Sequence, residues 1–202
     1  SPPGTSGLVY SAAANSGYTF TGFTGCVGNT TGGTTTGGTF TTTMASTCTL
    51  TANFRTMPTV TASVSGGNGT VSPASQAAHY NQPAPLTITP NTGYTVDTNA
   101  TTGCGGVTQI SGTSWQTAPV TGNCAVSVSF AVAQYTVTAT ATGNGTVTPG
   151  SAPVQHGQPA SFIVTPAANH HVTNVTSTCP SFPGFWINGN EYLLTNITAN
   201  CA

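Results

Sequence analysis

This 202-residue chain contains almost no charge. Its one basic residue besides histidine is Arg55, its acids are Asp97 and Glu191, and charged residues make up 1% of the sequence, whereas about 25% is usual in a soluble domain. Without clustered cations the chain cannot bind nucleic acid by displacing counterions or dock electrostatically on a membrane. Such a surface also lacks the charge repulsion that opposes self-association.

Groupings of residues that perform catalysis or bind metals are lacking as well. Asp97 and Glu191 lie in different parts of the chain, whereas a glycosidase needs two carboxylates flanking one bond and a calcium site needs several together. No Gly-x-Ser-x-Gly elbow of a serine hydrolase occurs. His170 and His171 are adjacent, so on a strand they point to opposite faces. We therefore expect no catalytic residues, no metal site and no cofactor.

Long apolar segments are also missing. No run approaches the roughly 20 apolar residues of a transmembrane helix, so we expect no membrane insertion. Apolar and polar residues alternate instead, as in Tyr135–Ala141, which is typical of a half-buried strand. Asn144-Gly145 follows this segment, as a hairpin turn requires, and a further short strand is expected at His171–Val175. These patterns predict an all-β protein.

The chain repeats itself. Cys48-Thr-Leu-Thr-Ala-Asn-Phe54 corresponds to Cys124-Ala-Val-Ser-Val-Ser-Phe130 at an interval of 76 residues, because 124 − 48 and 130 − 54 both equal 76. Asn68-Gly-Thr-Val-Ser-Pro73 corresponds to Asn144-Gly-Thr-Val-Thr-Pro149 at the same interval, and a third cysteine block begins at Asn200-Cys201-Ala202. Such periodicity indicates one supersecondary unit copied along the chain.

The interval divides the chain into a partial first copy at 1–57, a second copy at 58–133 and a third copy at 134–202. The first copy begins without the N-terminal hairpin of the unit. The third copy stops just after Cys201, where the pattern requires a Val-Ser-Val-Ser-Phe strand. Either the sequence is a window of a longer chain, or neighbouring chains complete the truncated ends.

Six cysteines, two in each copy, predict a tandem array of small disulfide-braced β-domains. Copies that fold alike most simply close one bridge each, and a closed loop of about 20 residues contributes roughly 3 kcal/mol in the chain-entropy model. Free buried thiols are the alternative, and zinc is disfavoured because no Cys-x-x-Cys pair occurs. Bridges in units this small favour an oxidising, extracytoplasmic setting. The expected pairs are Cys26 with Cys48, Cys104 with Cys124, and Cys179 with Cys201.

The order of motifs resembles the divergent bacterial repeat domains related to the internalin B-repeat. An alternating strand is followed by Gly-Asn-Gly-Thr-Val-Thr-Pro, Gly-Gln-Pro-Ala-Ser-Phe, Val-Thr-Pro, Gly-Tyr-Thr-Val, Gly-Cys-Gly-Gly and Asn-Cys-Ala-Val-Ser-Val-Ser-Phe, and the resemblance spans Leu8 to Cys201. It implies a stalk, spacer or adhesin segment of a secreted or surface-attached bacterial protein, and a fold rather than a reaction. The near absence of Lys, Asp and Glu departs from the usual pattern.

Glycan attachment would supply the hydration that charge does not. Asn68 and Asn144 lie in Asn-x-Thr triplets, but the hairpin turns explain them equally well. The Thr-rich run from Thr30 to Thr43 is the better candidate, since Ser/Thr-rich surface tracts often carry O-linked sugar. The candidate attachment residues are Thr34, Thr35, Thr36, Asn29, Asn99, Asn174 and Asn196.

Two tryptophans, Trp115 and Trp186, lie in or beside the variable loops. An exposed indole offers a flat apolar face on which a sugar ring can stack. Filling of the core by at least one of them is the competing interpretation. A carbohydrate-binding or spacer module of a secreted enzyme or adhesin is therefore the alternative function.

The principal expectation is a non-catalytic extracellular protein at the bacterial cell surface that polymerises with itself. An incomplete unit exposes an unpaired strand edge, and such edges recruit strands from other chains. Leu8, Tyr10 and Ala12 alternate in the segment Ser6–Ala14, which is the candidate donor strand for the third copy of a neighbour. The competing interpretation is that Leu8–Tyr10 pairs inside its own copy.

Overall fold

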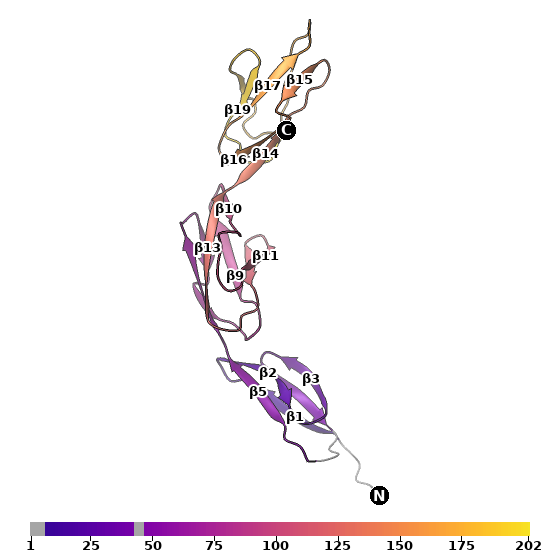
Figure 1. The fold of residues 1–202 in the computed structure, drawn as a ribbon, viewed down its shortest axis with the longest axis vertical. Helices are drawn as coiled ribbons and strands as arrows, with labels where there is room; N and C mark the ends of the chain where they lie inside the picture. Colours follow the sequence, from indigo (N-terminus) through magenta and orange to yellow (C-terminus); the bar gives the residue numbers. More distant parts are fainter. Residues whose placement is uncertain (1–6, 43–46) are drawn as a thin grey trace. The chain divides into compact units, whose positions relative to one another are not determined.

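The computed structural model describes residues 7–42 and 47–202 and consists of strands and connecting loops (Figure 1). No helix occurs in this described part of the chain, and none of it forms a helix long and apolar enough to cross a membrane. The prediction of an all-β protein is therefore confirmed. The chain divides into two compact units, Ser1–Thr89 with Asp97–Ser129, and Pro90–Val96 with Phe130–Ala202.

The second copy contains every strand of the repeating unit and serves as its reference. Its strands form two four-stranded sheets, in the orders β10-β13-β6-β8 and β11-β12-β9-β7. The strands are β6 (Thr59–Ser65), β7 (Gly69–Ser72), β8 (Ser75–Ala77), β9 (Pro85–Pro90), β10 (Tyr94–Val96), β11 (Val107–Ser111), β12 (Ser114–Thr117) and β13 (Cys124–Val132).

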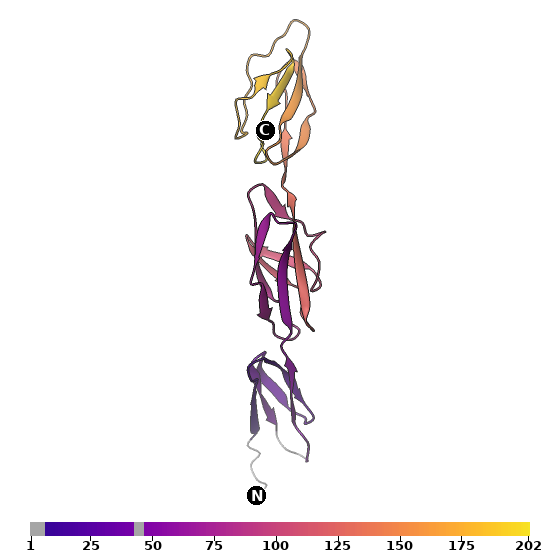
Figure 2. The same cartoon turned by 90° about the vertical axis from the view of Figure 1, so that its left-hand side faces the viewer.

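The closing strand β13 lies in the middle of its sheet. It pairs in parallel with β6 and in antiparallel with β10, and Figure 2 shows the salmon-coloured β13 beside the purple β6. The alternation along β13 separates a buried face from an exposed one. Val126 and Val128 are 1% and 0% exposed, whereas Ala125, which points to the opposite face, is exposed. Val126 and Val128, in the middle of the apolar face of β13, are thus fully buried.

The third copy rebuilds the same unit with fewer strands. Its larger sheet has the order β15-β17-β19-β18, which matches β7-β9-β12-β11, and its smaller sheet holds β14 and β16, which match β6 and β8. One apolar cluster joins the two sheets and includes Val137, Phe162, Tyr192 and Leu194. The strands are β14 (Gln134–Thr138), β15 (Gly145–Thr148), β16 (Ser151–Gln155), β17 (Ala160–Pro166), β18 (Phe185–Trp186) and β19 (Glu191–Leu194).

The first copy is reduced at its other end. Its sheets have the orders β1-β4-β3 and β2-β5, which match β9-β12-β11 and β10-β13, so its described residues contain no counterparts of β6, β7 and β8. The edge of β1 that does not face β4 therefore has no strand in the place of β7. The strands are β1 (Leu8–Ala13), β2 (Tyr18–Thr24), β3 (Asn29–Thr34), β4 (Gly37–Thr42) and β5 (Thr51–Thr56).

Candidate functional site

The three predicted disulfides are confirmed. The S–S distance is 2.05 Å for Cys26–Cys48, 2.05 Å for Cys104–Cys124 and 2.08 Å for Cys179–Cys201, and the six cysteines leave no free thiol. Each bridge ties a cysteine in a preceding loop to the cysteine at the position of the closing strand. In the second copy this cysteine is Cys124, the first residue of β13. In the second copy the bridge therefore fixes the first residue of β13, and in the first copy β5 begins three residues after Cys48, at Thr51.

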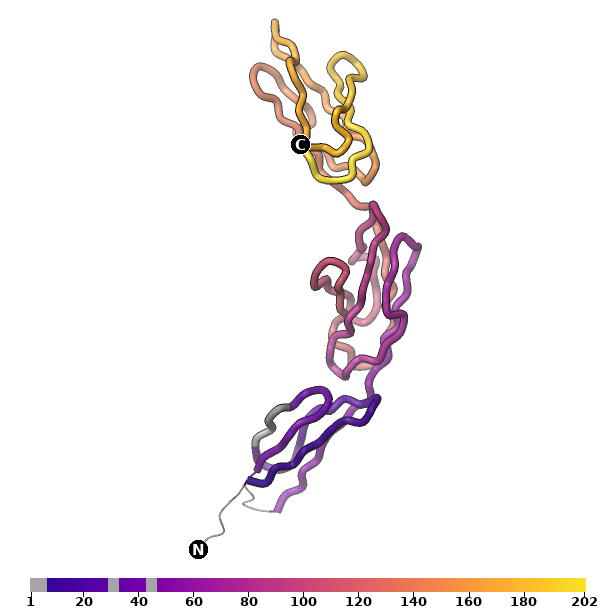
Figure 3. The backbone as a smooth tube through the Cα atoms, turned by 180° about the vertical axis from the view of Figure 1, so that it is seen from behind, coloured from indigo at the N-terminus to yellow at the C-terminus, as the bar shows by residue number. Residues whose placement is uncertain are grey.

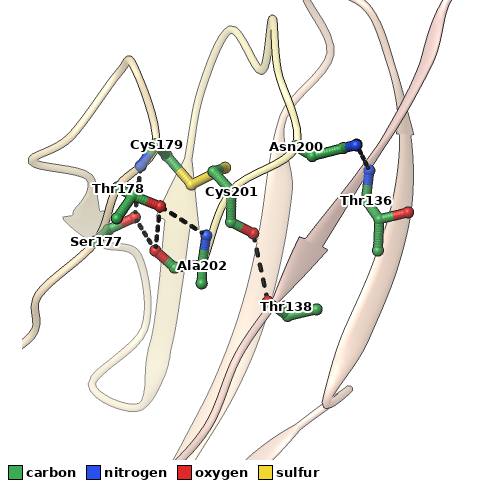
Figure 4. Close-up of a disulfide and its surroundings, with 8 residues drawn as sticks. All are labelled: Thr136, Thr138, Ser177, Thr178, Cys179, Asn200, Cys201 and Ala202. Carbon is green, nitrogen blue, oxygen red and sulfur yellow. Dashed lines mark hydrogen bonds between the residues drawn. A yellow bond between two sulfur atoms is a disulfide. The ribbon is translucent and has the colours of Figure 1, made fainter.

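In the third copy the bridge holds Cys201 against β14 (Figure 4). Cys201 forms an isolated parallel bridge with Val137. The Cys201 amide donates to the Thr136 carbonyl at 3.2 Å, and the Thr138 amide donates to the Cys201 carbonyl at 3.0 Å. The amide of Thr136 also donates to Asn200 Oδ1 at 2.8 Å. Figure 3 shows the yellow C-terminal end returning to the orange beginning of this copy.

The second copy starts its closing strand in the same way. Its Thr59 amide donates to Asn123 Oδ1 at 2.8 Å, and Cys124 lies opposite Val60 as Cys201 lies opposite Val137. There the parallel ladder continues as far as the pair Ser129–Ser65. In residues 134–202, all of which the structure describes, the ladder stops at Cys201.

An open groove follows the place where β13 would lie in the third copy. Its volume is about 560 Å³. One wall consists of residues 137–142, the other of residues 171–178, and Ala202 lies at one end. The floor is apolar and is formed by side chains of β15, β17 and β19. The floor residues are Val147, Phe162, Val164, Tyr192 and Leu194.

Both walls of the groove depart from the second copy in the same respect. β14 ends at Thr138, although its counterpart β6 continues to Ser65. The prediction of a strand at His171–Val175 is wrong, because residues 171–175 form no strand in the structure. The corresponding segment of the second copy, Tyr94–Val96, is the strand β10. In the second copy both segments pair with β13. Without that central partner their backbone groups have no ladder to join.

The end of the groove shows how a strand is held between the walls. The Thr178 amide donates to the Ala202 carbonyl at 2.8 Å, and the Ala202 amide donates to Thr178 Oγ1 at 3.1 Å. In the second copy Thr102 and Ser127 exchange amide–carbonyl hydrogen bonds at 2.9 and 3.0 Å. Residues 201–202 are thus held between β14 and Thr178, at a place in the closing strand two residues earlier than the Thr102–Ser127 pair of the second copy.

The candidate donor residues lie on β1. Leu8, Val9 and Tyr10 are 44%, 66% and 41% exposed. β1 pairs along its length with β4, from Leu8 opposite Thr42 to Ala13 opposite Gly37. This chain alone thus shows the competing arrangement, in which the segment pairs inside its own copy, with β1 as an apolar edge strand. Ser6, at the start of the predicted donor segment, lies outside the described residues.

The two tryptophans occupy different environments. Trp115 is 7% exposed, so its ring faces lie in the core and are not open to a ligand. Tyr192 takes the same place in the third copy, since it faces Trp186 as Trp115 faces Gln109. Trp186 is 39% exposed on the edge strand β18 and meets the Tyr192 ring edge-on at 5.0 Å between centroids.

The candidate glycosylation residues lie on the surface where their side chains are described. Asn99, Asn174 and Asn196 are exposed. Thr34 and Thr36 are exposed and their hydroxyl oxygens lie 2.9 Å apart, while Thr35 is half-buried. The side chain of Asn29 and residue Thr43 at the end of the Thr-rich run lie outside the described residues.

The side chains of Asp97 and His170 have local structural partners. Asp97 Oδ1 accepts the amides of Asn99 and Ala100 at 3.0 and 3.2 Å, which closes a turn. His170 lies 3.0 Å from Asn144 Nδ2 and 2.9 Å from the Ala168 carbonyl. Among residues 7–42 and 47–202, no three His, Cys, Asp or Glu side chains are grouped as a metal site requires.

Comparison with known proteins identifies one family. The family model described as the divergent InlB B-repeat domain matches residues 3–58 and 135–185, which together are more than half of the chain. Searches of curated proteins and of solved structures found no significant match.

Proposed function

Because this chain belongs to the divergent InlB B-repeat domain family, which is typical of bacterial surface and secreted proteins, we propose that it is a non-catalytic structural subunit of an extracellular bacterial fibre. Three intramolecular disulfides agree with an oxidising environment. The proposed fibre forms end to end, with each chain contributing a strand to the next.

One observation carries this proposal: the third copy has an apolar groove where the second copy has a buried strand. The floor of the groove includes Phe162 and Leu194, and the ladder that leads into it has begun at Cys201. A strand of alternating apolar residues added here would satisfy backbone groups and bury side chains together. Such strand addition is a general way in which proteins bind extended segments.

The proposed donor is Leu8–Ala13 of a neighbouring chain. Its alternate residues Leu8, Tyr10 and Ala12 correspond in spacing to Val126, Val128 and Phe130 of the second copy. β1 is an edge strand with exposed apolar side chains, so it can exchange its pairing with β4 for pairing in a partner. The very low charge of the chain leaves such contacts without long-range repulsion.

Deletion of residues 1–12 tests the proposal. The expected result is a folded monomer that forms no fibres, measured by light scattering after gel filtration and by negative-stain microscopy. Fibres of unchanged length would overturn the proposed joint.

A pair of substitutions separates donation from loss of the first copy. Tyr10→Asp places a charge among the residues proposed to enter the groove and should abolish fibres. Val9→Asp is the matched control, because Val9 lies on the opposite face of the same strand and is 66% exposed. Equal loss of assembly in both variants would contradict insertion of one face of β1.

The alternative function, a carbohydrate-binding or spacer module, is supported by the exposed aromatic edge around β18. Phe182, Phe185 and Trp186 are 37%, 54% and 39% exposed, and such rings can stack on sugars. Trp186→Ala should abolish glycan-array binding under this alternative, while Ile110→Ala in the second copy serves as an exposed apolar control. Unchanged glycan binding by the Trp186→Ala variant would rule out sugar stacking on Trp186 and with it this alternative function.

A further inference from the structure

Three asparagines of this chain are followed by glycine, and this pair is chemically reactive. The glycine amide nitrogen can attack the side-chain carbonyl carbon of the asparagine, because glycine has no Cβ to obstruct the approach. A C–N bond forms and closes a succinimide ring, the bond to the side-chain nitrogen breaks, and that nitrogen takes up the glycine amide proton through solvent and leaves as ammonia. Water then opens the ring to aspartate or isoaspartate. The pairs are Asn68-Gly69, Asn144-Gly145 and Asn188-Gly189.

The side chain of Asn144 is held by a histidine. Asn144 Nδ2 lies 3.0 Å from His170 Nε2, and His170 Nδ1 lies 2.9 Å from the Ala168 carbonyl oxygen. A carbonyl oxygen only accepts, so Nδ1 carries the proton, and Nε2 of the neutral ring accepts a proton of the Asn144 amide. This bond keeps the carboxamide turned toward His170 and hinders its rotation onto the following nitrogen.

The backbone of the same pair is not held in this way. Gly145 lies opposite Pro166, and the Ala167 amide donates to the Asn144 carbonyl at 3.0 Å. This pattern makes Gly145 a position without ladder hydrogen bonds, so its N–H points away from β17. Because β15 is the edge strand of its sheet, that N–H lies on the open side. The restraint on the reaction therefore comes from the Asn144 side chain.

The turn that carries His170 occurs in both copies. The His170 amide donates to the Ala167 carbonyl at 3.0 Å, and the Tyr94 amide donates to the Asn91 carbonyl at 3.0 Å. Tyr94 takes the place of His170 at the repeat interval. The second copy therefore builds the same turn, beside a complete closing strand, but has no imidazole there to hold an asparagine.

Asn68 has the same neighbours in sequence as Asn144 but no such partner. The sequence Gly-Asn-Gly-Thr-Val occurs at 67–71 and again at 143–147. Asn68 is exposed in the turn between β6 and β7, and in the part of the chain that the structure describes no group is hydrogen-bonded to its side chain. The third asparagine differs from it, since Asn188 Nδ2 donates to Glu191 Oε2 at 3.5 Å.

From these observations we infer that Asn68 is a site of spontaneous deamidation and that His170 protects Asn144 from the same reaction. The inference goes beyond the proposed function and does not depend on it. Conversion of Asn68 replaces a neutral amide by a carboxylate, in a chain that has two acidic residues and a formal net charge of −1. The turn between β6 and β7 thus gains charge as the protein ages.

Incubation of the purified chain at neutral pH, followed by proteolysis and mass spectrometry, measures both sites in one sample. Asn68 should convert about fivefold faster than Asn144, which is the rate factor for one hydrogen bond. In the reduced chain in denaturant the two sites should convert at equal rates, because their local sequences are the same. Equal conversion of the two sites in the folded chain, or no conversion at Asn68, would overturn the inference.

Histidine variants test the protection. His170→Ala should raise conversion of Asn144 about fivefold and leave Asn68 unchanged, whereas His170→Gln retains an acceptor and should keep Asn144 protected. His171→Ala is the matched control, because it removes the adjacent exposed imidazole without touching the bond. An equal increase in the two alanine variants, or none in His170→Ala, would overturn the role of His170. Hydrogen exchange of β15 and β17 in each variant shows that the fold is retained.

Discussion

The second and third copies differ by one strand, and the difference shows what that strand does. Both copies have the disulfide, the Asn side-chain hydrogen bond and the first parallel pair. With β13 present, its neighbours are the strands β6 and β10. Without it, β14 ends at Thr138 and residues 171–175 form no strand. The bridge thus starts the central ladder, but only the strand propagates it to both sides.

The largest expected effect comes from disrupting the closing strand where it exists. Val128→Asp places a carboxylate at a position that is 0% exposed, and an unpaired buried charge costs more than about 4 kcal/mol. We expect the second copy to unfold, with exchange of β6 and β10 becoming as fast as that of the groove walls. Ala125→Asp, on the exposed face of β13, should leave both strands protected.

The next largest effect is expected from removing a disulfide, and it should differ between the second and third copies. Replacing Cys179 and Cys201 by serine removes a bridge worth roughly 3 kcal/mol, and we expect the third copy to unfold because its ladder at Cys201 has no further rungs. The same change at Cys104 and Cys124 should lower the melting temperature but leave the second copy folded, since β13 retains its pairing. Thermal unfolding followed by hydrogen exchange distinguishes the two. Equal effects would contradict the stated role of the strand.

A smaller effect is expected from the asparagine that precedes each closing cysteine. Asn200→Ala and Asn123→Ala each remove one hydrogen bond to a backbone amide, a loss of about 1 kcal/mol. Local opening around Cys201 should increase more than around Cys124, because only the latter is held by a continuing ladder. Residue-resolved exchange rates measure this difference, and a larger effect in the second copy would speak against it.

Salt should have the smallest effect. The groove and β1 contain no charged side chains, so raising salt from about 0.1 M to about 1 M, which shortens the Debye length from about 10 Å to about 3 Å, should change the association constant less than about twofold. Sedimentation of fibres across this range measures it. A steep decrease with salt would point to an ionic contact outside the groove.

Most of the local structure was predictable from the sequence. The alternation in Tyr135–Ala141 identified a strand, although β14 ends at Thr138 and residues 139–141 are not part of it, and the repeat interval paired the cysteines correctly. Alternation shows which side chains face the core but not which strand lies alongside, so the parallel pairing of β6 with β13 could not be read from it. The repeat predicted that the strand after Cys201 is absent from residues 134–202, but it did not predict a groove between two walls, for the same reason.

One error of local prediction and one alternative left open by the sequence have a tertiary cause. His171–Val175 has the composition of a strand, but its ladder partner is the strand that residues 134–202 do not contain. Trp115 and Trp186 look alike in sequence, yet the register of each hairpin sends the first into the core and leaves the second on an edge. Pairing decided both outcomes, and pairing depends on residues distant in sequence.

The fixed first rung between Cys201 and Val137 also has a kinetic meaning. A strand entering the proposed joint would not have to nucleate a new ladder, because the disulfide has already placed the rung from which a parallel ladder zips. Zipping would begin at the Ala202 end and proceed in one direction. Contacts between unlike surfaces of identical chains build open filaments when the rotation between neighbours does not close a ring. The two tips of such a filament are chemically distinct, one displaying an open groove and the other a β1 that is still paired with β4, so growth would be polar.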